Sequence, residues 1–261
     1  GDWQVKTNLI LPTGSGLTIE AGVSLTMSPN TFIIVRGPLK LMGRVHDPVV
    51  LDSAAANAPW GGIAVLESPE PSLLRHSALR NMKTVQDGPW AMSGAVTFYR
   101  SEVTVEDSTF EKISAEDGIN IINSNFQIQR STIANTRSDA IDADFSNGSI
   151  SNSKFQNIGG DGIDVSGSKI DVNNVRLENI HDKAISVGEV SHMKASNIIV
   201  IDASTGVASK DGSLTEIKGA KFETIRNAAL MGYEKKPEYG PGRLFASEIE
   251  FKQVNQQAIV Q

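Results

Sequence analysis

Acidic and basic side chains recur in this chain at a spacing that could bring them together for acid–base chemistry. Asp142 and Asp164 each stand between two aliphatic or small residues, one repeat apart. Two carboxyl groups held close together can donate and accept protons in the cleavage of a glycosidic bond. Lys183 and Lys210 follow in the next two repeats, and a lysine whose pKa is lowered by burial can remove a proton from carbon. These four residues are the candidate catalytic groups.

A repeat of 22 or 23 residues positions these groups. Phe110, Phe155 and Phe222 share one place in it, and an isoleucine follows each of them three residues later. A further aliphatic residue follows seven to nine residues after the phenylalanine. A repeat of this length without helical spacing is typical of a solenoid whose coils bury a core only by stacking. The sequence therefore predicts an all-β, single-stranded parallel β-helix.

Alternation within the strands predicts which side chains face outward. Ile163 and Val165 point inward, so Asp164 and Ser166 point outward. Coils stack about 4.8 Å apart, and equivalent outward residues therefore form columns. The first column is predicted to contain Thr97, Asn120, Asp142, Asp164, Ser186, Ala208 and Met231, and the second Tyr99, Ile122, Asp144, Ser166, Gly188, Lys210 and Tyr233.

The two columns predict one groove with binding groups around its acids. Stacked carboxylates repel each other unless a cation compensates, and that cation is either Ca²⁺ or the ammonium group of Lys183 or Lys210. The predicted Ca²⁺ ligands are Asp142, Asp144, Asp164 and Glu189. The predicted substrate-binding residues are Tyr99, Arg100, Asn120, Ser166, Ser186, Tyr233, Lys235 and Tyr239.

Two reaction types fit these groups. In β-elimination or epimerisation of a uronic acid, a cation neutralises the sugar carboxylate while Lys183 or Lys210 removes the C5 proton. In glycoside hydrolysis, Asp142 and Asp164 act as acid and base. The lysines that accompany the acids favour elimination or epimerisation.

Part of the acidic pattern has a structural explanation. Asp117, Asp139 and Asp161 precede glycine or alanine at the turn into the groove strand, where aspartate stabilises a bend by bonding to the local backbone. The outward acids also fit a salt-bridged surface without chemistry, so a non-catalytic scaffold stays an alternative. A separate asparagine column is predicted to form a turn ladder: Asn152, Asn174 and Asn197.

Composition limits the class of partner. The 261 residues have a net charge of −6 and no cysteine, which argues against a nucleic-acid surface and excludes a disulfide framework. No apolar run approaches the roughly 20 residues that span a bilayer, so no membrane insertion is expected. The opening Gly1–Trp3 does not resemble a leader, which predicts an excised mature domain.

One elongated domain is predicted over residues 1–261. Its expected parts are the first coils and cap in 1–51, regular coils in 52–232, and a loop with the last coil in 233–261. Two segments exceed the repeat, 83–93 and 233–242. Insertions in a solenoid form loops on its flank, often at the binding face, so these loops are expected near opposite ends of the groove.

Short motifs resemble a known superfamily. Leu17–Val23, Gly37–Gly43 and Trp60–Ile63 are similar to bacterial right-handed parallel β-helices of the pectin-lyase-like superfamily. A second set resembles β-helix modules of bacterial surface proteins, some of them joined to spore-coat-H-like kinase domains: Phe98–Ser101, Ser138–Phe145, Gly159–Ser168, Lys183–Glu189, Ser209–Asp211 and Tyr233–Gly240.

The resemblance implies right-handed coils and a bacterial protein that is secreted, periplasmic or on the cell surface. The superfamily includes pectate and alginate lyases, mannuronan epimerases, polygalacturonases and phage tailspikes. It therefore implies action on a polysaccharide, and the lysines favour lyase or C5-epimerase chemistry on an acidic one. A carbohydrate-binding or surface scaffold and a glycoside hydrolase stay open as alternatives, as do further domains in a larger parent chain.

Overall fold

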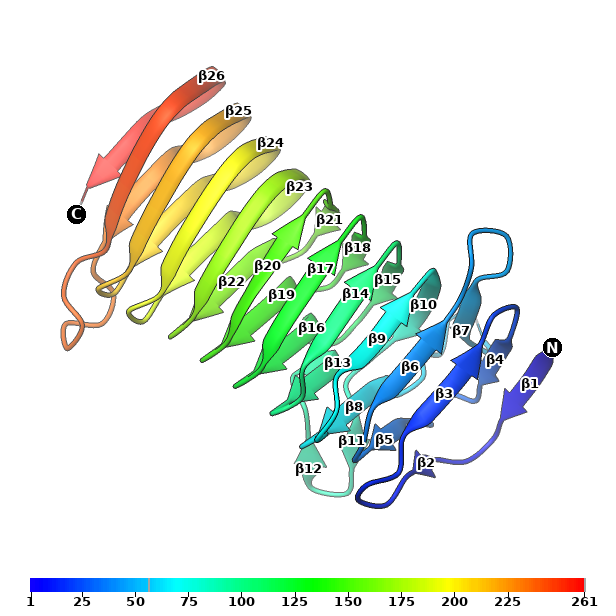
Figure 1. The fold of residues 1–261 in the computed structure, drawn as a ribbon. Helices are drawn as coiled ribbons and strands as arrows, with labels where there is room; N and C mark the ends of the chain where they lie inside the picture. The colour runs from blue at the N-terminus through cyan, green and yellow to red at the C-terminus, as the bar shows by residue number, and fades with distance from the viewer. Residues whose placement is uncertain (56, 261) are drawn as a thin grey trace.

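The computed structural model describes residues 1–55 and 57–260, which form a long stack of β-coils with no helix among them (Figure 1). The stack has about ten turns with about 23 residues in each. Along most of the stack a turn contributes three short strands, and each pairs in parallel with its counterpart in the next turn. The predicted parallel β-solenoid is therefore confirmed.

Three faces run along the stack. The groove face contains β2 (Leu9–Ile10), β5 (Ile33–Val35), β8 (Ile63–Leu66), β13 (Gly94–Tyr99), β16 (Asp117–Ile122), β19 (Asp139–Asp144) and β22 (Ile163–Ser166). The second face contains β3 (Leu17–Glu20), β6 (Leu39–Met42), β9 (Ser72–Arg75), β14 (Val103–Glu106), β17 (Asn125–Gln129) and β20 (Asn147–Ser151). The third face contains β1 (Asp2–Val5), β4 (Ser24–Met27), β7 (Val49–Ser53), β10 (Ser77–Met82), β15 (Thr109–Ile113), β18 (Thr132–Thr136) and β21 (Lys154–Ile158).

The last four strands each bend through all three faces. They are β23 (Lys169–Gly188), β24 (His192–Lys210), β25 (Leu214–Tyr233) and β26 (Arg243–Val260). Their final segments continue the groove face, because β22 pairs with the end of β23, which pairs with the end of β24. The groove face therefore extends along the whole stack.

The spacing of three residues in the repeat has a backbone cause. Phe155 and Ile158 are both buried although simple alternation would turn one of them outward. Asn157 between them has a φ of 56°, in the left-handed region that asparagine tolerates better than most residues. This single left-handed residue shifts the alternation so that both apolar side chains reach the core. The same conformation recurs at Lys112, Asn135, Asn179, Asp202 and Thr224.

Side-chain ladders join the coils at the corners. Asn174 Nδ2 donates to Asn152 Oδ1 at 2.8 Å, which confirms the predicted asparagine ladder at this step. At the corner between the groove face and the second face, buried serines accept a backbone hydrogen bond from the preceding coil, as Ser191 Oγ does from Ser168 N at 2.9 Å. These bonds satisfy backbone groups that face the interior at each turn.

The two long segments lie where the groove face begins and where it ends. The first carries the antiparallel hairpin of β11 (Gln86–Asp87) and β12 (Trp90–Ala91), which projects beside β13 (Figure 1). Val85 from this segment packs with Phe32, Ile34 and Leu66 on the outer side of the groove strands. The second joins β25 to β26 at the C-terminal end (Figure 1). The groove face is therefore apolar and covered near its start and polar further on.

None of the described segments forms a helix that is long and apolar enough to cross a membrane.

Candidate functional site

The strand register brings the predicted columns together. Asp142 is the register partner of Asn120 on one side and of Asp164 on the other, and Asp164 is in turn the partner of Ser186. Their neighbours Ile141 and Ile163 are fully buried, so the polar side chains project from the outer surface. The predicted outward register of the acids is therefore correct.

Several buried polar atoms in this column have no hydrogen-bond partner within the described part of the chain. They are Thr97 Oγ1, Asn120 Oδ1, Asp164 Oδ1 and Ser186 Oγ. Buried polar groups are satisfied in most native proteins, and exceptions gather where a ligand or a water completes them. The column therefore holds a line of buried polar atoms whose hydrogen bonds the described residues do not complete.

Asp142 lies at the centre of the acidic part of the groove. Burial raises its pKa to about 9, and repulsion from Asp117, Asp144 and Asp164 adds to the effect. Its one side-chain hydrogen bond comes from Asn120 Nδ2 to Oδ2 at 3.2 Å. Asp142 is therefore a protonated carboxylic acid at neutral pH, with a proton to donate.

Asp164 differs from Asp142 because it has a cationic partner. Lys210 Nζ lies 3.8 Å from Asp164 Oδ1, and only 9% of the lysine side chain is exposed. Lys210 stands two coils beyond Asp164, with Gly188 in the coil between. A Cβ atom at Gly188 would lie 2.6 Å from Lys210 Cε, so the lysine reaches Asp164 only because residue 188 has no side chain.

We expect Gly188→Ala to displace Lys210 from Asp164 while leaving the fold intact, since the added methyl group meets a flexible side chain. Lys210 should then acylate several times faster, as measured by peptide mass spectrometry against the exposed Lys194 of the same protein. An unchanged ratio between the two lysines would contradict the proposed path of Lys210 over Gly188.

Lys183 forms a buried ion pair at the start of the next groove strand. Its Nζ lies 3.2 Å from Asp161 Oδ1 and 2.5 Å from Asp182 Oδ2. Burial alone would lower the pKa of Lys183, but Asp161 and Asp182 outweigh it and raise that pKa. The prediction that burial lowers the pKa of Lys183 is therefore wrong, because Asp161 and Asp182 stabilise the ammonium form.

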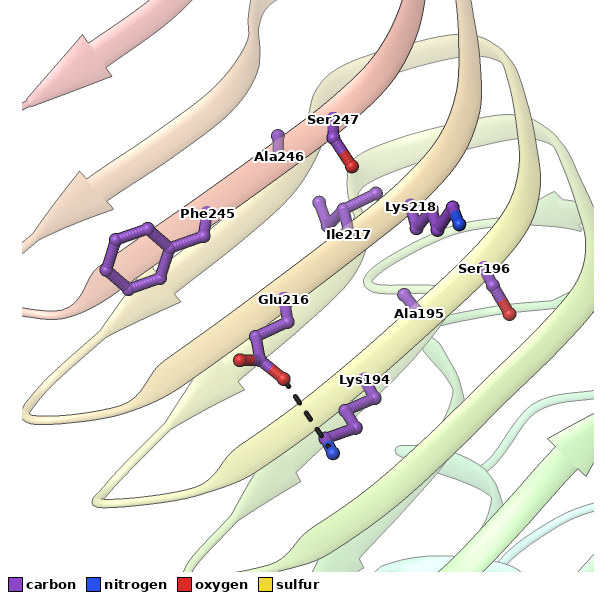
Figure 2. Close-up of a pocket in the computed structure, with 9 residues that line it drawn as sticks. All are labelled: Lys194, Ala195, Ser196, Glu216, Ile217, Lys218, Phe245, Ala246 and Ser247. Atoms are coloured by element: carbon purple, nitrogen blue, oxygen red, sulfur yellow. Dashed lines mark ion pairs between the residues drawn. The ribbon is translucent and has the colours of Figure 1, made fainter.

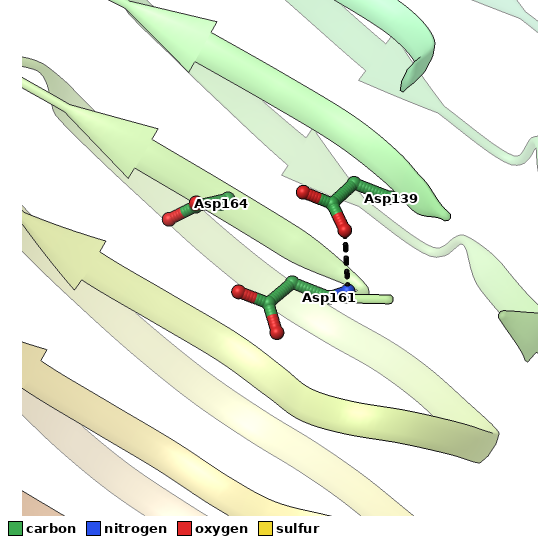
Figure 3. Close-up of side chains that lie close together, drawn as sticks. All are labelled: Asp139, Asp161 and Asp164. Atoms are coloured by element: carbon green, nitrogen blue, oxygen red, sulfur yellow. Dashed lines mark hydrogen bonds between the residues drawn. The ribbon is translucent and has the colours of Figure 1, made fainter. Parts of the chain in front are cut away.

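The acids at the turns have both a structural and an electrostatic role. Asp139 Oδ1 accepts the backbone N–H of Asp161 at 2.7 Å (Figure 3), and Asp161 Oδ1 accepts that of Lys183 at 2.8 Å. These bonds have a structural role, as predicted, but they join adjacent coils 22 residues apart and not the local backbone of the bend. Burial also raises the pKa of Asp161, to about 6, and that of Asp139. The sequence did not indicate that these residues border the groove acids.

The predicted calcium ligands do not form one cluster. Among the described residues, the acids whose oxygens come within 4.8 Å of one another are Asp139, Asp161 and Asp164 (Figure 3). Only Asp164 belongs to the predicted set. The ammonium group of Lys183 already lies against Asp161, so a metal ion at this cluster has to compete with a fixed positive charge.

Glu189 instead fastens the loop between β25 and β26. It accepts hydrogen bonds from Ser166 Oγ and Lys236 Nζ. Burial would raise the pKa of Glu189, but the bonds from Lys236 and Ser166 outweigh it and lower that pKa. Asp211 holds the same loop by accepting the backbone N–H groups of Lys235 and Lys236, each at 2.7 Å. Lys236 was not among the predicted site residues, although its neighbour Lys235 in the same loop was.

The predicted aromatic residues occupy different surroundings. Tyr99 packs against the apolar cluster at the start of the groove, and Tyr239 is exposed in the C-terminal loop. Tyr233 is the register partner of Lys210, and burial raises its pKa although Lys210 and Lys183 act in the opposite direction. Arg100 Nη1 lies 3.4 Å from Glu67 on the surface. Of these four, Tyr233 is the one beside the charged centre.

A shallow pocket elsewhere lies apart from this chemistry. Figure 2 shows it on the second face, where β24, β25 and β26 contribute three residues each. Its ion pair joins Lys194 to Glu216, and both side chains are largely exposed. Exposed pairs of this kind contribute little to stability.

A model of the family "Right handed beta helix region" matches residues 117–237, a little under half of the chain. These residues contain the acidic part of the groove. No curated protein is similar enough in sequence to be recognised as a relative.

Solved β-helix structures are similar in shape but distant in sequence. A mutant of the periplasmic alginate epimerase AlgG is 13% identical, with 99% of this chain and 77% of that one covered and a TM-score of 0.55. The enzymatically active domain of bacteriophage CBA120 tailspike protein 2 is 11% identical, covering 91% and 42%, with a TM-score of 0.56. The catalytic domain of a GH87 α-1,3-glucanase with nigerose is 10% identical, covering 97% and 66%, with a TM-score of 0.51.

At these identities the likeness shows the fold. Together with the family model, it supports the predicted right-handed parallel β-helix.

Proposed function

We propose that this chain is a polysaccharide-processing β-helix protein that hydrolyses glycosidic bonds in its acidic groove. The observation that carries the proposal is the pairing of two adjacent carboxyl groups in different surroundings. Among the described residues Asp142 has no cationic partner, and burial raises its pKa to about 9, whereas Asp164 faces Lys210. An acid and a base of one site are distinguished by such differences in surroundings. Asp142 is the general acid and Asp164 the base or nucleophile.

The state of the lysines favours hydrolysis over the elimination or epimerisation that the sequence suggested. A lysine that abstracts a proton has to be neutral when substrate binds. Lys183 is held as an ammonium by Asp161 and Asp182, and Lys210 is engaged with Asp164. Hydrolysis requires neither lysine to lose its proton, since each can stay paired with a neighbouring carboxylate.

The charge of the groove favours a neutral glycan. Asp117, Asp139, Asp142 and Asp144 all have raised pKa values, mainly because burial disfavours their charged forms and each meets other carboxylates. A uronate would bring a negative charge into surroundings that already disfavour the charged forms of these carboxyl groups. The acidic polysaccharide predicted from the sequence is therefore less compatible with this groove than a neutral one.

Elimination or epimerisation is the second candidate, and Tyr233 is the residue that favours it. Its phenol group is next to Lys210 in the register, where it could act as the proton-transferring group that Lys183 does not supply. Calcium would serve this reaction by neutralising the sugar carboxylate. Titration with Ca²⁺ alone by calorimetry tests whether the groove acids bind it.

The localisation and the wider context of the chain stay predictions. A secreted, periplasmic or surface location suits a protein that acts on polysaccharides. Attachment of this chain to further domains of a larger parent protein is a proposal as well.

We expect new reducing ends without unsaturated sugars when the protein is incubated with neutral polysaccharides such as amylose, laminarin and galactomannan. The register places the two residues in adjacent coils, and the backbones of neighbouring strands lie about 4.8 Å apart. Side chains that project in parallel from such strands would hold their carboxyl groups near the roughly 5 Å found in enzymes that retain anomeric configuration. Proton NMR of the first product should therefore show retention.

Alginate and polygalacturonate belong in the same set of polymers as controls. If alginate or polygalacturonate yields unsaturated sugar ends or a changed ratio of uronate epimers, the protein catalyses elimination or epimerisation and not hydrolysis. Binding without any covalent change would indicate a scaffold.

A further inference from the structure

Phe145 lies at the edge of the groove, at the corner between the groove face and the second face. It directly follows Asp144 of the second column and has a φ of 51°, the left-handed conformation that Arg100, Asn123 and Glu189 also adopt at this corner of their coils. The side chain is 67% exposed, although a phenylalanine would bury its ring if the fold allowed it. The exposed ring, and not the backbone, therefore distinguishes Phe145 from the other corner residues.

The ring of Phe145 is supported from behind. Gly167 occupies the next place in the same column of turns, and a Cβ atom there would lie 2.6 Å from Phe145 Cδ1. The ring thus lies against the bare backbone of Gly167 on one side and faces solvent on the other. This produces a flat aromatic surface with restricted motion.

Polar groups surround the exposed ring. Phe145 lines a pocket of about 540 Å³ at the corner between the groove face and the second face, together with Arg100, Glu102, Asn123 and Asn147. Within the described part of the chain, no side-chain hydrogen bond is formed by the amides of Asn123 and Asn147, while Arg100 is held only by its 3.4 Å contact to Glu67. Donors and acceptors are therefore free around an aromatic surface.

We infer that this pocket is a sugar-binding subsite in which a pyranose ring stacks on Phe145 and its hydroxyl groups bond to Asn123 and Asn147. The C–H face of a pyranose is complementary to the negative face of an aromatic ring, and the hydroxyl groups need both donors and acceptors. The inference rests on the proposed function, since the sugar would belong to the glycan bound along the neighbouring groove acids.

Affinity electrophoresis through gels that contain amylose, laminarin or galactomannan tests the subsite without requiring catalysis. Phe145→Asn removes the ring and keeps a residue that tolerates the left-handed conformation. We expect it to bind the retarding polymer about tenfold more weakly, a usual loss for an anchoring aromatic residue. Phe145→Trp should retain binding. Phe245→Ala is the matched control, because Phe245 is 61% exposed on the second face (Figure 2) and should bind as the unchanged protein does.

Equal retardation of Phe145→Asn and the unchanged protein would overturn the subsite, as would the absence of retardation by every polymer. If Phe145→Asn loses binding and the unchanged protein produces no reducing ends, the subsite is supported and the proposed hydrolase activity is excluded. Circular dichroism and thermal unfolding of each variant establish that the coils are intact.

Discussion

Replacement of Asp164 by asparagine is expected to lower the hydrolysis of the cleaved polymer by on the order of a thousandfold, within the range known for lost acid or base groups. Asparagine keeps the size of the side chain but neither accepts a proton nor attacks carbon. Substrate binding should change much less, because the other polar groups of the column remain. The measurement is the initial rate of reducing-end formation, with binding followed separately by affinity electrophoresis.

A matched control separates the groove from a general effect of charge. Asp171 is an exposed aspartate in the part of β23 that lies on the second face, and Asp171→Asn should leave the rate unchanged. Addition of azide to Asp164→Ala provides a further distinction. If Asp164 is the nucleophile, azide should occupy the vacated space and yield a glycosyl azide of inverted configuration. A rate for Asp164→Asn within twofold or so of the unchanged protein would exclude a catalytic role.

Stability of the protein should fall as the pH rises, and Asp142 should be the largest single cause. Burial raises the pKa of Asp142 to about 9, that of Asp117 to about 7 and that of Asp161 to about 6, each from an ordinary value of 3.8. Between these values the folded chain holds protons that the unfolded chain has released. The stabilisation is complete below the unfolded pKa and is lost as the pH rises through the folded pKa.

We expect Asp142→Asn to be more stable than the unchanged protein at alkaline pH by about 2 kcal/mol, since the variant avoids an unpaired buried charge. The free energy of unfolding, measured by denaturant titration from acid to alkaline pH, should decline less steeply in the variant. Asp171→Asn serves again as the control. Parallel curves for Asp142→Asn and the unchanged protein would show that Asp142 does not hold its proton in the folded state.

The repeat predicted the architecture and the main columns because both depend on local rules. Ile141 and Ile163 alternate with Asp142 and Asp164, and only one register buries the isoleucines. Stacking of equivalent residues then follows from the parallel pairing. The sequence did not reveal the cause of the three-residue spacing, which needed the left-handed backbone at positions such as Asn157.

The charge states could not be predicted because they depend on contacts that cross the repeat. Lys183 was expected to lose its proton on burial, but Asp161 and Asp182, one coil away and next in sequence, hold that proton. Lys210 reaches Asp164 over two coils by a path that Gly188 leaves open. Lys236 comes from the loop and meets Glu189 across 47 residues of sequence. Column patterns predict neighbours in a stack but not the course of a long flexible side chain.

The parallel stacking of the coils has a consequence for how such a protein changes in evolution. The strands of each coil pair only with those of the coils beside it, so deletion or duplication of one whole repeat would leave strand interfaces of the same type. The ion pair between Lys210 and Asp164 does not share this tolerance, because it requires one coil between the two residues, the coil that contains Gly188. Removal of the coil that contains Gly188 would leave a solenoid that can still fold, but Lys210 would then lie in the coil next to Asp164. The fold is thus modular in units of one coil, whereas the candidate site needs three consecutive coils, those of Asp164, Gly188 and Lys210.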